Sequence, residues 1–171
     1  MSWKNGGGIT SQIKIFPEHA APAADSFHWR LSTATVSQTG AFSLFKGCDR
    51  WLVIIEGDGL VLNGTLLPAF KPFKFSGDIP IHCQIVGVQV IDLGLIFRRD
   101  KLAAKMEWID FSGSEKIYFE PGTHLFYCLN GGLKINGIKA EKGDTVLMEG
   151  PFEATLNATG PVSYVYVKLI F

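Results

Sequence analysis

The stretch Gly57-Asp58-Gly59-Leu60-Val61-Leu62-Asn63-Gly64 has a counterpart later in the chain, Asn130-Gly131-Gly132-Leu133-Lys134-Ile135-Asn136-Gly137. Each consists of a glycine turn, a short strand and an Asn-Gly turn, which is the sequence pattern of a β-hairpin. The likeness extends upstream, where residues 51–55 correspond to residues 124–128. This repeat predicts two similar β-units in one chain, and the alternative is that two hairpins converged on the same turn chemistry.

Strand-sized apolar runs bounded by Gly, Pro and Asn recur throughout the chain, and only residues 101–106 suggest a helix, a short one. Many short strands separated by turn residues are typical of an all-β barrel or sandwich. We therefore predict an all-β protein with two barrels, connected by residues 94–111. The strands are expected at residues 10–16, 27–36, 51–56, 60–62, 83–92, 107–111, 116–119, 125–129, 133–135, 145–148 and 162–171.

The composition excludes several classes of partner. Lys plus Arg and Asp plus Glu each number 16 in 171 residues, so bulk charge attracts neither nucleic acid nor an acidic membrane. The apolar runs are too short to cross a bilayer, and the start of the chain does not have the pattern of a signal peptide. Three widely spaced cysteines, Cys48, Cys83 and Cys128, predict free and mostly buried thiols. We therefore expect a cytoplasmic protein.

Five blocks occur in order in the first hundred residues: Trp3-Lys4-Asn5-Gly6-Gly7-Gly8-Ile9-Thr10, Phe27-His28-Trp29-Arg30-Leu31-Ser32, Gly40-Ala41-Phe42-Ser43-Leu44-Phe45-Lys46-Gly47-Cys48-Asp49-Arg50, Pro72-Phe73-Lys74-Phe75-Ser76-Gly77-Asp78 and Asp92-Leu93-Gly94-Leu95-Ile96-Phe97-Arg98-Arg99. As an ordered set they resemble the HutD/Ves family of bicupins, although the family usually has Asn at position 94 and Met at position 96. The resemblance implies two fused double-stranded β-helix (cupin) barrels, residues 1–98 and 99–171, packed as one compact unit.

Metal-dependent cupins hold their ion with two His, a Glu and a later His, and this chain departs from that pattern. The first barrel has no possible ligand at the first three places: Phe45, Gly47 and Trp51. The second barrel offers a poor set: Tyr118, Glu120, His124 and Glu153. The alternative interpretation is that Glu120 is a surface charge and His124 a strand residue near a rim. We predict that neither barrel binds a metal and that the protein has no cofactor.

Strand alternation points to a polar patch inside the first barrel. In residues 27–36, Arg30 and Ser32 lie on the face opposite to the bulky side chains. A buried guanidinium is costly unless an anion meets it, so the pattern indicates either a ligand or a structural ion pair. The candidates for that pair are Asp49, Asp78 and Asp92. Arg50 has a similar position at the start of the next strand, and Arg99 is expected to be a solvated turn residue.

We predict a binding site for a small organic carboxylate in the first barrel, since a guanidinium binds a planar carboxylate through two hydrogen bonds. The glycines after Asn5 are also able to present N–H groups to an anion. In this predicted site, positively charged groups and neutral hydrogen-bond donors surround the ligand, and aromatic rings form the walls of the site. Asp78 is expected to orient an arginine or to accept a hydrogen bond from the ligand. The candidate site residues are Trp3, Lys4, Asn5, Arg30, Ser32, Phe42, Arg50, Phe75, Asp78 and Arg98.

No nucleophile motif or phosphate loop is visible, so we expect a binding protein more than an enzyme. The resemblance to HutD implies a role in histidine utilisation, in which the protein senses or buffers urocanate, formylglutamate or formate and so regulates the pathway. Two alternatives remain: a cofactor-free cupin isomerase or hydrolase acting on a small organic acid, and a Ves-like stress-response protein. The long strand expected at residues 162–171 is also compatible with a homodimer formed by edge pairing.

Overall fold

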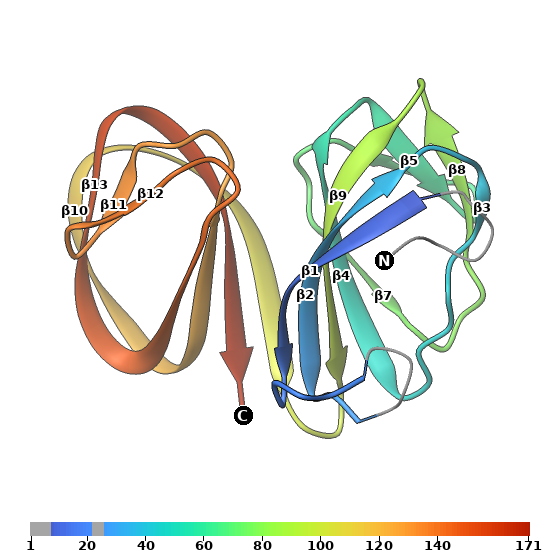
Figure 1. Cartoon of the computed structure of the whole chain (residues 1–171), viewed down its shortest axis with the longest axis horizontal. Helices are drawn as coiled ribbons and strands as arrows, with labels where there is room; N and C mark the ends of the chain where they lie inside the picture. Colours follow the sequence, from blue (N-terminus) through green and yellow to red (C-terminus); the bar gives the residue numbers. More distant parts are fainter. Residues whose placement is uncertain (1–7, 22–25) are drawn as a thin grey trace. The chain divides into compact units, whose positions relative to one another are not determined.

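The computed structural model describes residues 8–21 and 26–171. Its regular structure consists of strands, and no helix occurs in these two ranges, which confirms the all-β prediction. The chain divides into two compact units, the first ending at Leu102 and the second running from Ala103 to Phe171 (Figure 1).

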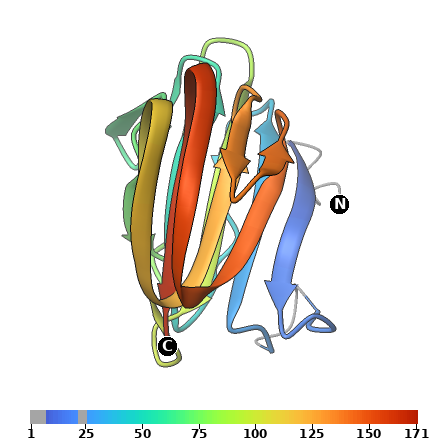
Figure 2. The same ribbon diagram turned by 90° about the vertical axis from the view of Figure 1, so that its left-hand side faces the viewer.

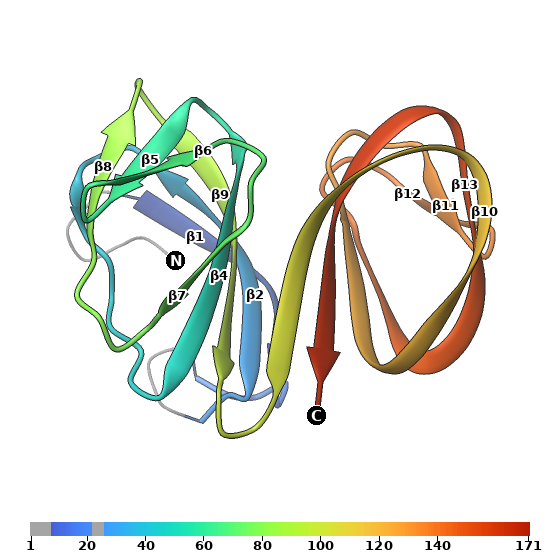
Figure 3. The same ribbon diagram turned by 180° about the vertical axis from the view of Figure 1, so that it is seen from behind.

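The first unit contains two antiparallel sheets. Its strands are β1 (Gly8–Phe16), β2 (Trp29–Val36), β3 (Gly40–Ala41), β4 (Cys48–Glu56), β5 (Gly59–Leu62), β6 (Thr65–Pro68), β7 (Phe73–Ser76), β8 (His82–Val86) and β9 (Val90–Arg98). One sheet has the order β1-β2-β9-β4-β7 and the other the order β3-β8-β5-β6. Figure 3 shows β4 and β7 side by side in the larger sheet. The core lies between the sheets, where Leu52 and Ile54 of β4 meet Leu60 of β5 and Cys83 of β8.

The second unit is built around two long strands. It contains β10 (Ala103–Cys128), β11 (Leu133–Ile135), β12 (Ile138–Ala140) and β13 (Thr145–Ile170), in the sheet order β10-β13-β11-β12. Residues 123–127 of β10 pair with residues 145–149 on one side, and residues 123–128 pair with residues 164–169 on the other. Strand β13 therefore folds back around β10, and Figure 2 shows the two long strands following each other.

Glycines let the long strands bend without ending. The register between β10 and β13 shifts at Gly113 and at Gly122, and both glycines have positive φ. A Cβ on Gly122 would lie 2.4 Å from the backbone oxygen of Leu169, so only glycine allows the two strands to approach there. The short strands predicted at residues 107–111, 116–119 and 125–129 are thus parts of one continuous strand.

Two predictions about the middle of the chain are wrong. Residues 101–106 do not form a helix, because Lys101 and Leu102 belong to a turn and β10 begins at Ala103. From Ala103 to Met106 exposed and buried residues alternate, which is the pattern of a strand with one face inside. The predicted connection over residues 94–111 does contain the boundary between the two units, but its extent is wrong, since β9 continues to Arg98 and only the short turn separates it from β10.

The strand predicted at residues 83–92 is divided into β8 and β9. Gly87, with φ of 83°, lies in the bend between them. The short strands β3, β6, β7 and β12 are not among the strands predicted from the sequence. Each of these has four residues or fewer, so the period of two is hardly visible in the sequence.

The repeated Asn-Gly turns form the same hairpin in both units. Asn63 and Gly64 connect β5 to β6, Asn136 and Gly137 connect β11 to β12, and all four residues have positive φ, as a type I′ turn requires. Each Asn side chain also accepts a hydrogen bond from a neighbouring strand, Asn63 from the His82 N–H at 2.8 Å and Asn136 from the Thr155 N–H at 2.9 Å. The hairpins predicted from the repeat are confirmed.

His124 occupies the core of the second unit rather than a rim, which corrects the expectation for this residue. Its side chain is 0% exposed and packs against Phe119, Phe152 and Tyr166. Nε2 lies 2.8 Å from the Glu120 carbonyl oxygen, which only accepts, so Nε2 carries the hydrogen. Nδ1 therefore accepts from the Tyr166 hydroxyl at 2.6 Å. Burial lowers the pKa of His124, which keeps this imidazole neutral.

Tyr166→Phe should lower the free energy of unfolding by about 1–3 kcal/mol, because it leaves the buried Nδ1 of His124 without its donor. Tyr118→Phe is the matched control, because the Tyr118 side chain is 64% exposed and its hydroxyl can be replaced by water contacts. Urea titration of both variants measures the difference. Equal stabilities for the two variants would contradict the assigned hydrogen bond.

Candidate functional site

The register of the larger sheet brings two arginines into one row. Arg30 of β2 pairs with Ile96 of β9, Ile96 pairs with Arg50 of β4, and Arg50 pairs with Phe75 of β7. Residues paired across antiparallel strands point to the same face of the sheet. These four side chains therefore share one face, although Arg30 and Arg50 come from strands that are not neighbours.

This face is the interior of the first unit. The next row joins Ser32, Gly94 and Leu52, and the row after it joins Ala34, Asp92 and Ile54. Leu52 and Ile54 belong to the core between the two sheets. Arg30 and Ser32 of β2, Arg50 of β4 and Asp92 of β9 thus point inward, as the sequence predicts for Arg30 and Ser32.

Arg30 is buried without full satisfaction of its guanidinium. Its side chain is 8% exposed, and its Nε has no hydrogen-bond partner among residues 8–21 and 26–171. Within these ranges no carboxylate lies at ion-pair distance from Arg30, and two of the expected partners, Asp49 and Asp78, bind Arg99 instead. Burial lowers the pKa of Arg30. An orphaned buried donor of this kind is costly, and an anion would satisfy it.

Arg50 is held by aromatic rings. Its guanidinium carbon lies 5.0 Å from the ring centres of Phe42 and Phe75 and 5.5 Å from that of Phe45. Its Nη1 also donates to the Ser43 carbonyl oxygen at 3.3 Å. Burial lowers the pKa of Arg50 to about 10, with Asp92 opposing this shift and Arg30 adding to it. Arg50 therefore stays charged at neutral pH, and its cation–π contacts hold it in place.

Asp92 is the acidic group of the same interior. Its side chain is 5% exposed, and burial raises its pKa from 3.8 to about 7, although the charge of Arg50 acts in the opposite direction. Gly94 leaves space beside it, since a Cβ there would lie 3.6 Å from Asp92 Oδ1. A buried carboxylate that is costly to ionise and lies in the field of an arginine is typical of a functional site more than of a structural one.

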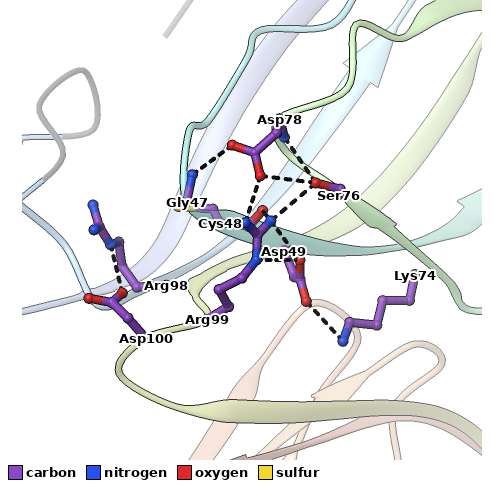
Figure 4. A network of polar contacts seen from close by, with 9 residues as sticks. All are labelled: Gly47, Cys48, Asp49, Lys74, Ser76, Asp78, Arg98, Arg99 and Asp100. Carbon is purple, nitrogen blue, oxygen red and sulfur yellow. Dashed lines mark hydrogen bonds and ion pairs between the residues drawn. The ribbon is translucent and has the colours of Figure 1, made fainter.

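A separate polar network surrounds the end of β9 (Figure 4). Arg99 donates from Nη1 to Asp78 at 2.6 Å, from Nη2 to Asp49 at 2.9 Å and from Nη2 to the Cys48 carbonyl oxygen at 2.6 Å. Asp49 also pairs with Lys74 at 3.0 Å. Arg99 lies in an exposed turn, as expected, and in addition it ties this turn after β9 to β4 and to the end of β7.

Asp78 and Arg98 belong to this outer network and not to the interior row. Asp78 accepts from the Gly47 N–H at 2.8 Å, and this contact followed by that of Arg99 lowers the pKa of its carboxyl group. It orients an arginine, as the sequence analysis allowed, but that arginine is Arg99. Arg98 Nε donates to Asp100 at 3.1 Å (Figure 4).

Of the candidate residues, five gather in the interior: Arg30, Ser32, Phe42, Arg50 and Phe75. Trp3, Lys4 and Asn5 lie outside the described residues. Phe45 is not among the predicted site residues, and Asp92 is predicted only as an ion-pair partner. The signal for Asp92 is a lone carboxylate within the apolar run Val90-Ile91-Asp92-Leu93, at a spacing of two from Gly94 and Ile96.

The possible metal ligands of the second unit are not brought together. Both ring nitrogens of His124 are hydrogen-bonded, Glu120 pairs with Lys168 at 2.6 Å, and Glu153 pairs with Lys116. No group of three His, Cys, Asp or Glu side chains in the described part of the chain is placed to hold a metal ion. The side chains that are present thus do not fit a metal site of the cupin type.

The cysteines are buried and free, as predicted. Burial raises the pKa of Cys83, which faces the interior of the first unit, to about 11, and Asp92 adds to this shift. The thiol is therefore protonated at neutral pH and is not an activated nucleophile. No helix long and apolar enough to cross a membrane occurs in the ranges that the structure covers.

Several known proteins are similar to this chain. The sequence model of the HutD family matches residues 1–165. An "uncharacterized 21.2 kDa protein in hutC 3'region" of Pseudomonas putida is 33% identical over 142 residues, which are 80% of this chain and 72% of that protein. Protein Ves of Citrobacter koseri is 37% identical over 114 residues, which are 63% of this chain and 58% of that protein.

Solved structures show the same fold. A conserved protein of unknown function from Pseudomonas aeruginosa PAO1 has a TM-score of 0.88 and 29% identity, covering 100% of this chain and 93% of its own. HutD from Pseudomonas fluorescens SBW25, in a formate condition, has a TM-score of 0.82 and 27% identity, covering 100% and 94%. A cupin 2 conserved barrel domain protein from Leptotrichia buccalis, 11% identical with a TM-score of 0.56 and coverage of 99% and 92%, shows the fold alone. The predicted cupin fold class is confirmed.

Asp92→Asn should stabilise the protein at high pH. Because the folded-state pKa of Asp92 is raised from 3.8 to about 7, its contribution to stability is present at low pH and is lost as the pH rises through about 7. We expect a gain of up to roughly 4 kcal/mol in the free energy of unfolding at pH 8 and a clearly smaller gain at pH 5. Urea titrations at both pH values measure this, with exposed Asp58→Asn as the control. Equal gains at the two pH values would show that Asp92 is not perturbed.

Arg99→Lys should destabilise the first unit although it preserves the charge. A lysine has no planar fork and is unable to contact Asp49, Asp78 and the Cys48 carbonyl oxygen together. We expect a loss of about 1–2 kcal/mol in the free energy of unfolding. Arg98→Lys is the neighbouring control and should cost less. The network has no stabilising role if Arg99→Lys unfolds at the same urea concentration as the parent protein.

Proposed function

Because the chain belongs to the HutD family, we propose that its first unit binds a small organic carboxylate and that the protein thereby senses or buffers an intermediate of histidine utilisation. The observation that carries this proposal is the buried guanidinium of Arg30, whose Nε lacks a partner in the described chain while it shares a row with Arg50. A carboxylate supplies the acceptors that this row lacks.

The two arginines have different roles in the proposed complex. Arg30 presents its fork to the carboxylate, because no described carboxylate occupies it. Arg50, fixed between Phe42, Phe45 and Phe75, supplies a second positive charge in a position that needs no rearrangement on binding. The Ser32 hydroxyl is a neutral donor in the adjacent row, and the proposal assigns Lys4 and Asn5 to the same carboxylate and Trp3 to a wall.

The relatives support the biological setting. One curated relative is described by its place in the hutC 3' region, and one solved relative is HutD in a formate condition. Urocanate, formylglutamate and formate each carry the carboxylate that the row of Arg30 and Arg50 would bind. Binding without conversion would make the protein a regulator of this pathway.

A cofactor-free isomerase or hydrolase is the second candidate, because one group in the interior has a pKa near neutrality. Burial raises the pKa of Asp92 to about 7, as a general acid or base requires. Nuclear magnetic resonance spectra of urocanate and formylglutamate after incubation with the protein separate the candidates. Unchanged ligand supports the binding protein, and a new product supports the enzyme.

Arg30→Lys should weaken carboxylate binding while preserving the charge, because the bidentate contact is lost. Loss of a hydrogen bond to a charged group costs on the order of 1.5–3 kcal/mol, or about ten-fold or more in Kd. Calorimetric titration with formate and with urocanate measures the effect. Lys139→Arg, a charge-preserving change in the second unit, should leave both affinities unchanged.

Lys4→Ala extends the same test to the start of the chain. The proposal expects weaker binding and nearly unchanged thermal stability, since a terminal lysine contributes little to a core. If Arg30→Lys and Lys4→Ala both bind a confirmed ligand like the parent protein, the carboxylate site lies elsewhere.

A further inference from the structure

Asp92 and the two arginines mark opposite ends of the inward face. Asp92 and Ile96 are four residues apart on β9, which corresponds to about 13 Å along a strand. Arg30 and Arg50 flank Ile96, whereas Ala34 and Ile54 flank Asp92. A ligand whose carboxylate lies at the arginine row therefore directs its other end toward Asp92.

In the row between these ends, β9 contributes Gly94 and therefore no side chain. A Cβ added at Gly94 would lie 3.6 Å from Asp92 Oδ1 and 3.9 Å from the Ser32 backbone oxygen. The flanking residues are Ser32 and Leu52, one polar and one apolar. A flat group lying over Gly94 thus has a hydroxyl on one side, an aliphatic chain on the other and the Asp92 carboxylate ahead of it.

Asp92 itself offers acceptors without a cation at contact distance. Its side chain is 5% exposed, and within the described ranges no Lys, Arg or His nitrogen lies within ion-pair distance of it. Arg50 acts on it only through the longer-range field. A buried carboxylate of this kind is stabilised by any N–H group that reaches it, and it repels a second carboxylate.

We propose that Asp92 is a specificity-determining residue, which accepts a hydrogen bond from an N–H group at the end of the ligand remote from its carboxylate. This inference rests on the proposed carboxylate site at Arg30 and Arg50. It assigns the ligand to a class, acids that carry an N–H donor on a flat remote group. Acids of the same shape that present an acceptor to Asp92 should bind more weakly.

The charged and titratable groups that act on Asp92 in the described chain are Arg50 from β4 and Cys83 from β8, and Arg30 from β2 lies on the same face in the row of Ile96. The pKa of Arg50 is about 10 and that of Cys83 about 11, and an arginine such as Arg30 stays charged throughout. Between about pH 5.5 and 8.5 Asp92 is thus the member of this set that changes charge. A change in the preference between two ligands over this pH range therefore reflects the protonation of Asp92.

Two ligands of matched shape test the proposal: 3-(pyrrol-2-yl)acrylate, whose ring has an N–H donor, and 3-(furan-2-yl)acrylate, whose ring has an oxygen acceptor. Both have the same carboxylate, and neither ring titrates near neutral pH. Calorimetry at pH 8 should show that the wild-type protein prefers the pyrrole acid by about ten-fold or more, the effect of one hydrogen bond to a charged group.

Asp92→Leu, which keeps the approximate size but removes the acceptor, should reduce the preference to near unity. Asp92→Asn retains an uncharged acceptor and should keep part of the preference for the pyrrole acid. The wild-type protein provides a measurement that needs no variant: the preference should decline as the pH falls from 8 to 5.5, because Asp92 becomes protonated. A preference that is the same in Asp92→Leu and at both pH values would overturn the assignment of Asp92.

The outcomes also separate this inference from the function on which it rests. If the wild-type protein binds both acids equally, the carboxylate site stands and the role of Asp92 is wrong. If neither acid nor formate binds, the carboxylate site itself is wrong and the inference is overturned with it. Arg30→Lys should weaken both acids by the same factor, leaving their ratio unchanged.

Discussion

The antiparallel register of β2, β9 and β4 is the constraint on which the site depends. Side chains alternate between the two faces of a strand, so a slip of one residue would turn Arg30 outward and Leu31 inward. Leu31, Leu93 and Leu95 are completely buried on the opposite face. Because both faces are covered, any slip would exchange apolar and charged groups. The apolar residues thus fix the register, and the register places the charged ones.

The two units contain the same type of hairpin, but their buried polar groups differ. Asn63 and Asn136 occupy the same turn position and bind the neighbouring strand in the same way. In the second unit the buried polar group, His124, has partners for both ring nitrogens and aromatic neighbours on its faces. In the first unit Arg30 lacks such a partner in the described chain. The buried imidazole of the second unit is thus satisfied by its own unit, whereas the buried Nε of Arg30 has no partner among the described residues.

Local sequence signals explain which parts of the fold were predictable. The Asn-Gly turns, the strands around Trp29 and Leu52, and the strand Leu133–Ile135 all have strong turn chemistry or clear alternation. The continuity of β10 and β13 was not predictable, because glycine is a turn signal in the sequence and also the residue of a bulge within a ladder. Only the partner strand distinguishes the two, and that partner is distant in the chain. The burial of His124 was hidden for the same reason.

The sequence predicted those residues of the candidate site that lie on a single strand. Alternation alone placed Arg30 and Ser32 inside, whereas the row that joins Arg30 to Arg50 through Ile96 needs the register between distant strands. The outer network is connected to this row through the backbone. Arg99 binds Asp49 and Ser76, which are the chain neighbours of Arg50 and Phe75. By holding these two backbones together at the end of β9, the network fixes the row in which Arg50 meets its aromatic rings. Residues of the outer network, which lie outside the interior, thus preorganise the row of Arg50.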